Sequence, residues 1–515
     1  MSSSRAKTAR PLTRRHVLLG IAASAARLEA QVSSAEDDAA ELAELDAVAA
    51  LERMARGEVS AERYARALLA RCAAGASLNA WISLEPERVL EAARDCDRAR
   101  RAGERLGPLA GLPMPIKDSV NTAQYPTTAG TPALRSFRPR HDAPVVHALR
   151  RAGAVVLGKT NLHELSYGWT SNNQAYGAVR NPYQPHRIPG GSSGGTAAAI
   201  AARMAPLGVA EDTQGSIRVP AALCGLYALR PTTGRYSTQG AVPITPLFDQ
   251  VGPHARSVRD LALFDAVLTG APPRAGSTRP LRGTRLAVVR DYFFTDLDPE
   301  VEQLSEQALA QLRAAGAELI EAQMPGLAAL IERTTDPIQN HDVRFALPAY
   351  LKEYGAPVSF EALLEQASAD IRETFRRDVL PGGEHFVSAA DYAAARTTHL
   401  PALRRLYRDV FARSGADAVV FPATLVPAPL IGEEAGFTIR GRRIEFETGM
   451  ARNISPGSTA GVPGLVVPIG LTAAGLPVAL EFDAPAGGDR ELLALGAAVE
   501  SLLQRLPPPP RAGLG

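Results

Sequence analysis

Two short segments rich in glycine and serine lie near the middle of the chain. Residues 190–195 read GGSSGG and residues 213–216 read TQGS, and Ser216 follows Ser192 by 24 residues. A turn of small residues before an expected helix can point successive backbone N–H groups at one spot. Such a set of donors stabilises an oxyanion. The second segment therefore predicts an oxyanion-binding turn, with Ser216 at its end as the natural nucleophile.

Residues 190–195 taken alone resemble a flexible linker, because glycine and serine make tethers of low stiffness. The flanking sequence argues against a tether, since the residues that follow, TAAAIAARMA, are typical of a helix. A further candidate for chemistry is Lys117, which ends the apolar run LPMPI in a strand-like segment at 109–121. An apolar setting disfavours the charged ammonium, so Lys117 can act as a neutral base.

Two other motifs match known expressions but not their mechanisms. Residues 153–160, GAVVLGKT, fit the phosphate-loop pattern, yet the four intervening residues are themselves a strand and offer no loop. Residues 191–195 fit the G-x-S-x-G elbow of many hydrolases, which needs a preceding strand. The preceding NPYQPHRIP is broken by proline. Neither nucleotide binding nor a nucleophile elbow is therefore expected.

The elements around these motifs alternate between helix and strand. Residues 39–75 have apolar residues at helical spacing, and buried strands are expected at 154–157, 285–293, 417–424 and 464–470. A long helix is expected after the strand at 285–293, followed by another strand. Alternating helices and strands of this kind predict an α/β fold.

Composition excludes several classes of protein. The chain has 515 residues, 56 basic and 54 acidic, and a formal net charge of +2, which gives no electrostatic case for a nucleic-acid partner. The three cysteines are widely spaced and form no metal-ligand pattern. No apolar run is long enough for a membrane span.

The first 30 residues have a different character. A basic start leads to Arg14 and Arg15 and then to a mildly apolar stretch, and TRRHVLLG resembles a twin-arginine export signal. We therefore interpret residues 1–30 as a targeting segment for export, with cleavage after Ala25 or Ala30. A basic tail on a cytoplasmic protein is the alternative.

Several separated motifs resemble the amidase signature family of serine hydrolases. They include MPIKDS around Lys117, RNPYQPHRIPGGSSGG, EDTQGSIR with Ser216, and the late segment STAGVPGLVVPIG. The spacing between Ser192 and Ser216 also matches the family, and the resemblance covers about residues 45–505. It implies a three-layer α/β/α fold with a central twisted, mixed sheet. Residues 31–515 would form a single amidase domain, with the signature core at about 109–260.

The resemblance also implies roles for particular residues. Ser216 would attack the amide carbonyl, Ser192 would relay its proton, and Lys117 would be the base. Ser192 would follow a cis peptide bond, with Gly190 and Gly191 before it and Ser193 in support. The oxyanion would be held by the backbone N–H groups of Thr213, Gln214, Gly215 and Ser216. No metal or organic cofactor is implied.

One departure from the family pattern concerns this turn. The family usually has GTDTGGS, whereas this chain has AEDTQGS, so that Glu211 and Gln214 replace a threonine and a glycine. Only backbone N–H groups are needed at the turn, so Gln214 fits if its φ is negative.

The segment NLHELSYGWTSNNQAYGAVRNPY looks most like the indoleacetamide and mandelamide hydrolase branch. It suggests a small carboxylic amide of aryl or arylacetamide type as substrate, with Tyr167, Trp169 and Tyr176 lining an acyl pocket or packing in the core. Two other functions stay open: an amidotransferase subunit that releases ammonia for transfer-RNA-dependent amidation, and a catalytically silent binding protein. A homodimer is also open.

Overall fold

The computed structural model describes residues 37–271, 280–503 and 505–510. The candidate targeting segment at 1–30 lies outside this part of the chain. The strands, in chain order, are β1 (Trp81–Leu84), β2 (Pro113–Lys117), β3 (Val155–Thr160), β4 (Asn172–Asn173), β5 (Gly177–Ala178), β6 (Leu207–Asp212), β7 (Tyr227–Arg230), β8 (Gln250–Ala255), β9 (Arg285–Val288), β10 (Glu318–Glu321), β11 (Ala418–Pro422), β12 (Phe437–Ile439), β13 (Arg442–Ile444), β14 (Gly464–Leu471) and β15 (Pro477–Asp483).

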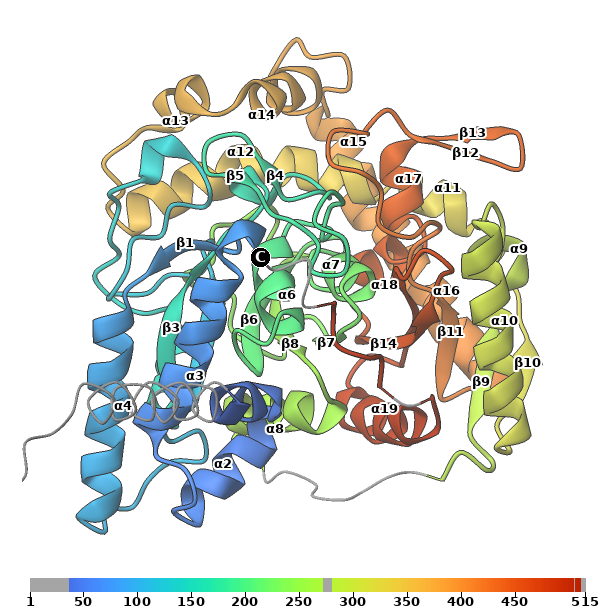
Figure 1. Ribbon diagram of the computed structural model, residues 1–515. Helices are drawn as coiled ribbons and strands as arrows, with labels where there is room; N and C mark the ends of the chain where they lie inside the picture. Colours follow the sequence, from blue (N-terminus) through green and yellow to red (C-terminus); the bar gives the residue numbers. More distant parts are fainter. Residues whose placement is uncertain (1–36, 272–279, 504, 511–515) are drawn as a thin grey trace, which may run out of the picture.

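Eleven of the described strands form one sheet in the order β1-β3-β2-β6-β8-β7-β14-β15-β11-β9-β10. The pairings β2–β3, β2–β6, β9–β10 and β9–β11 are parallel, and the other six are antiparallel. The sheet runs from β1 and β3 on the left of Figure 1 to β9 and β10 on the right. The predicted mixed central sheet is confirmed.

Helices surround this sheet. They are α2 (Ala47–Ala55), α3 (Ala61–Ala74), α4 (Pro86–Arg101), α5 (Pro144–Arg151), α6 (Gly194–Ala201), α7 (Arg218–Leu223), α8 (Val258–Thr269), α9 (Arg290–Phe293), α10 (Pro299–Ala314), α11 (Leu327–Glu332), α12 (Thr335–Glu353), α13 (Phe360–Gln366), α14 (Ala369–Thr374), α15 (Ala389–Ala394), α16 (Leu400–Ser414), α17 (Phe446–Ala451), α18 (Ser455–Ala460) and α19 (Asp489–Leu503). Single turns of 3₁₀ helix are η1 (Ala76–Leu78), η2 (Pro132–Leu134) and η3 (Glu164–Ser166). The π-helical segment η4 (Phe375–Val379) continues α14, and η5 (Ala395–His399) joins α15 to α16.

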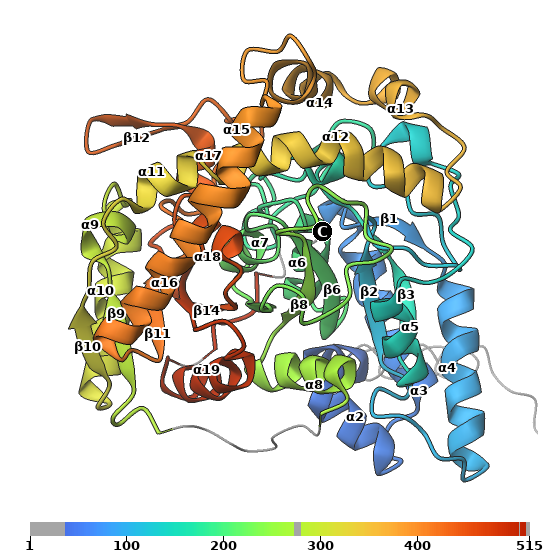
Figure 2. The same ribbon diagram turned by 180° about the vertical axis from the view of Figure 1, so that it is seen from behind.

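Helices lie on both sides of the sheet, as expected for an α/β fold. Helix α6 is in front of the strands in Figure 1, whereas α5 and α16 are in front in the view from behind in Figure 2. Helices α12 to α15 lie together at one end of the molecule in both views. That end contributes part of the cavity described below.

The two rejected motifs have the structures that the sequence predicts. Residues 155–160 of the phosphate-loop pattern are strand β3, and residues 181–189 before the glycine-serine segment contain no strand. Helix α6 begins at Gly194, and all of its residues are buried. Because these residues are mostly glycine and alanine, α6 can approach β2, β6 and β8 closely.

The parallel pairing of β2 with β6 brings the predicted site together. Ile116 of β2 pairs with Val209 of β6, so both strands end at the same edge of the sheet. Lys117 ends β2, and Asp212 ends β6 just before the oxyanion turn. Both strands are buried throughout, as expected of strands covered on two faces.

Candidate active site

Lys117 lies at the centre of a buried polar cluster. Its Nζ is 2.7 Å from Ser192 Oγ and 3.0 Å from Glu211 Oε2, and it also donates to the Glu211 main-chain oxygen at 3.4 Å. All three residues are 1% exposed or less. The structure therefore brings together two of the three residues predicted for catalysis, with a carboxylate that the sequence did not assign.

The environment of Lys117 favours its neutral form. Burial lowers the pKa of the Lys117 amine, and the negative charges of Glu211, Asp212 and Asp249 oppose that lowering. The net direction is downward, below the usual range of a lysine. A lysine that loses its proton more readily is better suited to accept one from a serine hydroxyl.

The glycine-serine segment presents Ser192 to Lys117. The peptide bond between Gly191 and Ser192 is cis, as the family resemblance implies. Gly190 has a φ of +86°, and a Cβ there would lie 2.9 Å from Cα of Pro220. Ser193 Oγ donates to the Glu211 main-chain oxygen at 3.0 Å. Gly190 thus satisfies a backbone requirement, and Ser193 anchors the segment to β6.

The Asp212 carboxylate fixes the predicted oxyanion turn, residues 213–216, by hydrogen bonds. Its Oδ1 accepts the Gly215 N–H at 2.9 Å, and its Oδ2 accepts the Ile217 N–H at 3.0 Å. Burial acts to raise the pKa of Asp212, but Arg218 and Arg230 lower it below its usual range. A charged carboxylate therefore fixes the shape of the turn.

This contact changes the set of predicted oxyanion donors. The Gly215 N–H donates to Asp212 and so does not point at the oxyanion position. Glycine is needed at this position for its backbone conformation, because its φ is +139° and a side chain would collide with Ile454. The backbone N–H groups of Thr213, Gln214 and Ser216 have no acceptor among the described residues. The φ of Gln214 is not positive, so this residue can replace the family's glycine in the turn without backbone strain.

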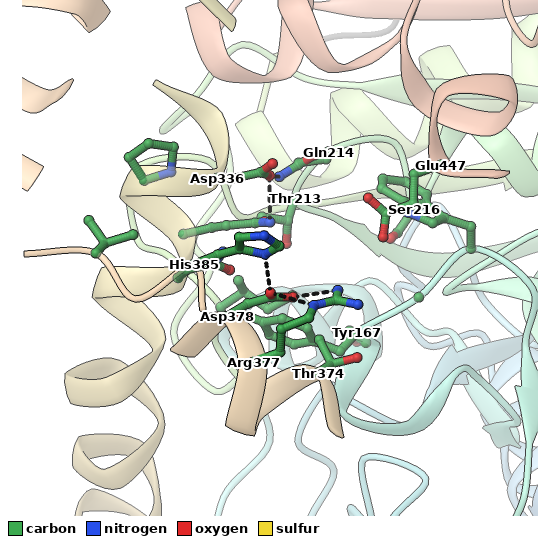
Figure 3. A pocket seen from close by; sticks show the side chains of 18 of the residues that line it. Tyr167, Thr213, Gln214, Ser216, Asp336, Thr374, Arg377, Asp378, His385 and Glu447 are labelled. Carbon is green, nitrogen blue, oxygen red and sulfur yellow. Dashed lines mark hydrogen bonds and ion pairs between the residues drawn. The ribbon is translucent and has the colours of Figure 1, made fainter. Parts of the chain in front are cut away.

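Ser216 opens into a cavity of about 450 Å³. The cavity is bounded by residues 166–169, by Thr213 and Gln214, by the start of α12, and by Glu447 of α17. Figure 3 shows Ser216 and Glu447 on one side and the hydrogen-bonded group of Arg377, Asp378 and His385 on another. The Ser216 hydroxyl makes no hydrogen bond to another residue in the described part of the chain. The side chain is free to meet a ligand.

The three aromatic residues predicted for the acyl pocket do not share one place. Tyr167 and Trp169 line the cavity, and the Tyr167 ring also packs on Phe375 at a centroid distance of 4.9 Å. Tyr176 is not among the lining residues, because the β4–β5 turn directs it to Arg135, whose guanidinium lies 5.5 Å from the ring centroid. Tyr176 therefore takes the packing role that the sequence left open as the alternative to the pocket.

Several residues of the site were not predicted from the sequence. Glu211 contacts Lys117, and Asp336 accepts from the Gln214 side-chain amide at 3.4 Å. Asp336 and Glu447 line the cavity, and burial raises the pKa of both carboxyl groups. The only available signal was the departure from the family pattern at Glu211; the other two lie on segments that the sequence does not connect to the motifs.

A buried lysine in contact with a buried serine, together with a second serine that lines a cavity, is the set of groups expected of a serine hydrolase with a lysine base. The family model described as Amidase matches residues 63–493. Indoleacetamide hydrolase from Agrobacterium vitis is 38% identical over 454 residues, covering 88% of this chain and 96% of that protein. Mandelamide hydrolase from Pseudomonas putida is 36% identical over 469 residues, covering 88% and 91%.

The solved structures agree. The native peptide amidase from Stenotrophomonas maltophilia superposes with a TM-score of 0.75 at 31% identity, covering 90% of this chain and 98% of that one. The chain therefore belongs to the amidase family, and it hydrolyses amides. The recognition made from the separated motifs is confirmed.

In the described ranges, no helix is long and apolar enough to cross a membrane. Over the same ranges, no group of three or more histidine, cysteine, aspartate or glutamate side chains is placed to hold a metal ion.

Proposed function

We propose that this enzyme hydrolyses a small carboxylic amide of aryl or arylacetamide type to the acid and ammonia, through an acyl-enzyme on Ser216. One observation carries the proposal: Lys117 Nζ lies 2.7 Å from Ser192 Oγ, at the edge of the sheet where Ser216 opens into the cavity. A buried amine in contact with a hydroxyl is the start of a proton relay.

The reaction begins with attack of Ser216 Oγ on the amide carbonyl carbon. The Ser216 proton passes to Ser192, whose own proton passes to Lys117 Nζ. The N–H groups of Thr213, Gln214 and Ser216 then stabilise the oxyanion. When the C–N bond breaks, the proton returns by the same path to the leaving amine, and water hydrolyses the ester in the second half-reaction. Catalytic hydrogen bonds often tighten only when substrate is bound, which suits the open Ser216 hydroxyl.

One part of the cavity wall suits an aromatic acyl group, while charged residues such as Asp336, Arg377 and Glu447 form another part. Its volume of about 450 Å³ suits a small ligand. Tyr167, Trp169, Ile244 and Val387 offer apolar and aromatic surface next to Ser216. The names of the similar indoleacetamide and mandelamide hydrolases point to the same substrate class.

Ammonia release tests the proposal directly. We would measure it from indole-3-acetamide, benzamide and a short aliphatic amide, with the unaltered enzyme, Ser216→Ala and Ser237→Ala. Ser237 is exposed and does not line the cavity, so it is a matched serine-to-alanine control. We expect the two aryl amides to be preferred and turnover to vanish only in Ser216→Ala. Turnover of the aliphatic amide alone would overturn the substrate class, and turnover by Ser216→Ala would overturn the nucleophile.

We also propose that residues 31–515 act as one amidase domain and that residues 1–30 direct export. The first proposal is supported by the eleven-stranded sheet, which contains both β1 near the start and β15 near the end of the described chain. The pair Arg14 and Arg15 supports the second. Fusing residues 1–30 to a reporter tests export: we expect transport that is lost when both arginines become lysine. Retention of the reporter in the cytoplasm would contradict it. Size-exclusion chromatography decides between a monomer and the open alternative of a homodimer.

A further inference from the structure

Glu211 joins the residues around Lys117 into one buried cluster. Its Oε2 accepts hydrogen bonds from Lys117 Nζ at 3.0 Å, Ser119 Oγ at 3.2 Å and Ser166 Oγ at 3.0 Å. Its main-chain oxygen accepts from Ser193 Oγ at 3.0 Å. The side chain is 1% exposed. Burying a carboxylate this deeply costs free energy of folding unless hydrogen bonds and a positive charge compensate for its lost hydration.

The contacts of Lys117 show what Glu211 provides. A neutral amine has two N–H bonds and one lone pair. Two of the three neighbours of Nζ belong to Glu211, namely Oε2 at 3.0 Å and the main-chain oxygen at 3.4 Å, and both are acceptors. The third neighbour is Ser192 Oγ at 2.7 Å. When the two N–H groups bind Glu211, the lone pair faces the serine hydroxyl from which it takes a proton.

We propose that Glu211 is a positioning residue for Lys117, which orients the neutral amine toward Ser192 and stabilises the ammonium that forms when the proton arrives. This proposal rests on the proposed function, in which Lys117 is the base and Ser216 the nucleophile. The arrangement parallels the aspartate of a Ser-His-Asp triad, which orients the histidine and stabilises the imidazolium without taking the proton.

The proton balance is complete within these residues. During acylation the bond from Ser216 Oγ to the carbonyl carbon forms, and one proton moves through Ser192 to Lys117 Nζ. The resulting ammonium donates three hydrogen bonds, two of them to Glu211. When the C–N bond breaks, the proton leaves Lys117 through Ser192 for the amine.

Two buried histidines also face Lys117 but do not compete for the proton. Burial lowers the pKa of His163 and of His254 to about 4 in each case, and the charge of Lys117 acts in the same direction. His254 Nε2 is 2.6 Å from the main-chain oxygen of Ile217. Both rings are neutral over the pH range in which a lysine base operates.

Two aspartates are the other charged groups near the pair. Arg218 and Arg230 hold Asp212 in its ionised form. Burial and the charge of Glu211 raise the pKa of Asp249 to about 8, and its carboxylate binds Thr213 Oγ1 at 2.7 Å and no atom of Lys117. Asp249 therefore serves for comparison, because it is a buried acidic group that acts on Lys117 through its charge and without a hydrogen bond.

The test is the pH profile of Ser216 reactivity. We would measure the rate of labelling by a fluorophosphonate probe from pH 5 to 10 in the unaltered enzyme, Glu211→Gln and Asp249→Asn. Glutamine keeps an acceptor for the three donors on Oε2 but removes the charge. We expect Glu211→Gln to move the acid limb to lower pH by about 1–3 units. We also expect its plateau rate to fall about 10- to 100-fold. Asp249→Asn should shift the limb less.

If the acid limb of Glu211→Gln stays where it is while the labelling rate falls, the role of Glu211 is merely structural and the proposal is overturned. Should Glu211→Gln not fold, Glu211→Asp decides, because it keeps the charge but draws it back by one methylene. A smaller shift of the limb in the same direction is expected, and an unmoved limb overturns the proposal. Labelling of Ser216→Ala at the normal rate would instead sink the proposed function, so the two failures are distinguishable.

Discussion

Lys117 and Lys159 are two buried lysines on neighbouring strands, and each is paired with a carboxylate. Lys159 Nζ lies 2.9 Å from Asp118 Oδ1, and Lys117 Nζ lies 3.0 Å from Glu211 Oε2. Burial lowers the pKa of both amines, and the paired carboxylate opposes it. In the register of β2 and β3, Lys159 pairs with Ile116, so that the two lysines point to opposite faces of the sheet.

The difference lies in the remaining contacts of each amine. Lys159 donates to Thr127 Oγ1 at 2.9 Å and to the Pro126 main-chain oxygen at 3.2 Å, which tie down a loop. Lys117 instead reaches Ser192 Oγ, beside the cavity of Ser216. Burial, a lowered pKa and a hydroxyl contact therefore do not identify a base, because Lys159 has all three. What distinguishes Lys117 is that its hydroxyl partner, Ser192, belongs to the glycine-serine segment.

The largest effect should separate the two lysines. We expect Lys117→Met to lower kcat/KM by about 10²–10⁴-fold, because the base is gone. Lys159→Met should keep kcat/KM per folded molecule but destabilise the protein by about 3–5 kcal/mol, because Asp118 is left buried and unpaired. Kinetics normalised by active-site titration, together with thermal unfolding, measure both. Equal loss of kcat/KM in the two variants would contradict the distinction between Lys117 as the base and Lys159 as a structural residue.

The next effect concerns the hydroxyl that distinguishes the Lys117 site. Ser192→Ala removes the relay between Lys117 and Ser216, and we expect kcat to fall about 100-fold or more. Ser193→Ala removes only an anchor to the Glu211 main chain and should cost a few-fold at most. Steady-state kinetics on the preferred amide compare the two. A loss in Ser193→Ala as large as that in Ser192→Ala would contradict the relay.

The pH dependence sharpens the comparison further. Only neutral Lys117 accepts a proton, so kcat/KM should rise with pH, about tenfold per unit below the pKa, and level off above it. Because burial lowers this pKa, the plateau should begin below the usual range of a lysine. Lys159→Met should leave the position of this limb unchanged. A profile that falls with rising pH over this range would show that protonated Lys117 is the active form.

The smallest effect tests the cavity. Trp169→Ala removes aromatic surface next to Ser216, and we expect KM for indole-3-acetamide to rise about tenfold. Tyr176→Ala, which lies outside the cavity, should change KM less than twofold. Competition between aryl and aliphatic amides reports the same preference. The reverse order of effects would return Tyr176 to the pocket and remove Trp169 from it.

Much of this architecture was predictable because it rests on local patterns. Short motifs with characteristic spacing predicted a strand in the 155–160 segment, a helix after the glycine-serine segment and the contact between Lys117 and Ser192. The pairing of Lys117 with Glu211 was not predictable in the same way, because it depends on which strand lies beside β2.

The cavity walls were the least predictable part. Asp336, Asp378 and Glu447 lie more than 100 residues after Ser216 in the chain and carry no pattern that ties them to it. Tyr176 shows the reverse problem, because it is close to Trp169 in sequence yet a tight turn sends it elsewhere. Closeness along the chain does not give the direction of a side chain.

Mapping the serine that reacts with a fluorophosphonate probe tests the central claim most directly. We predict a single adduct on Ser216, absent in Ser216→Ala, formed far more slowly in Lys117→Met and at the normal rate in Lys159→Met. An adduct on Ser192 or Ser193, or equal slowing by the two lysine substitutions, would contradict the assignment of Ser216 as nucleophile and Lys117 as its base.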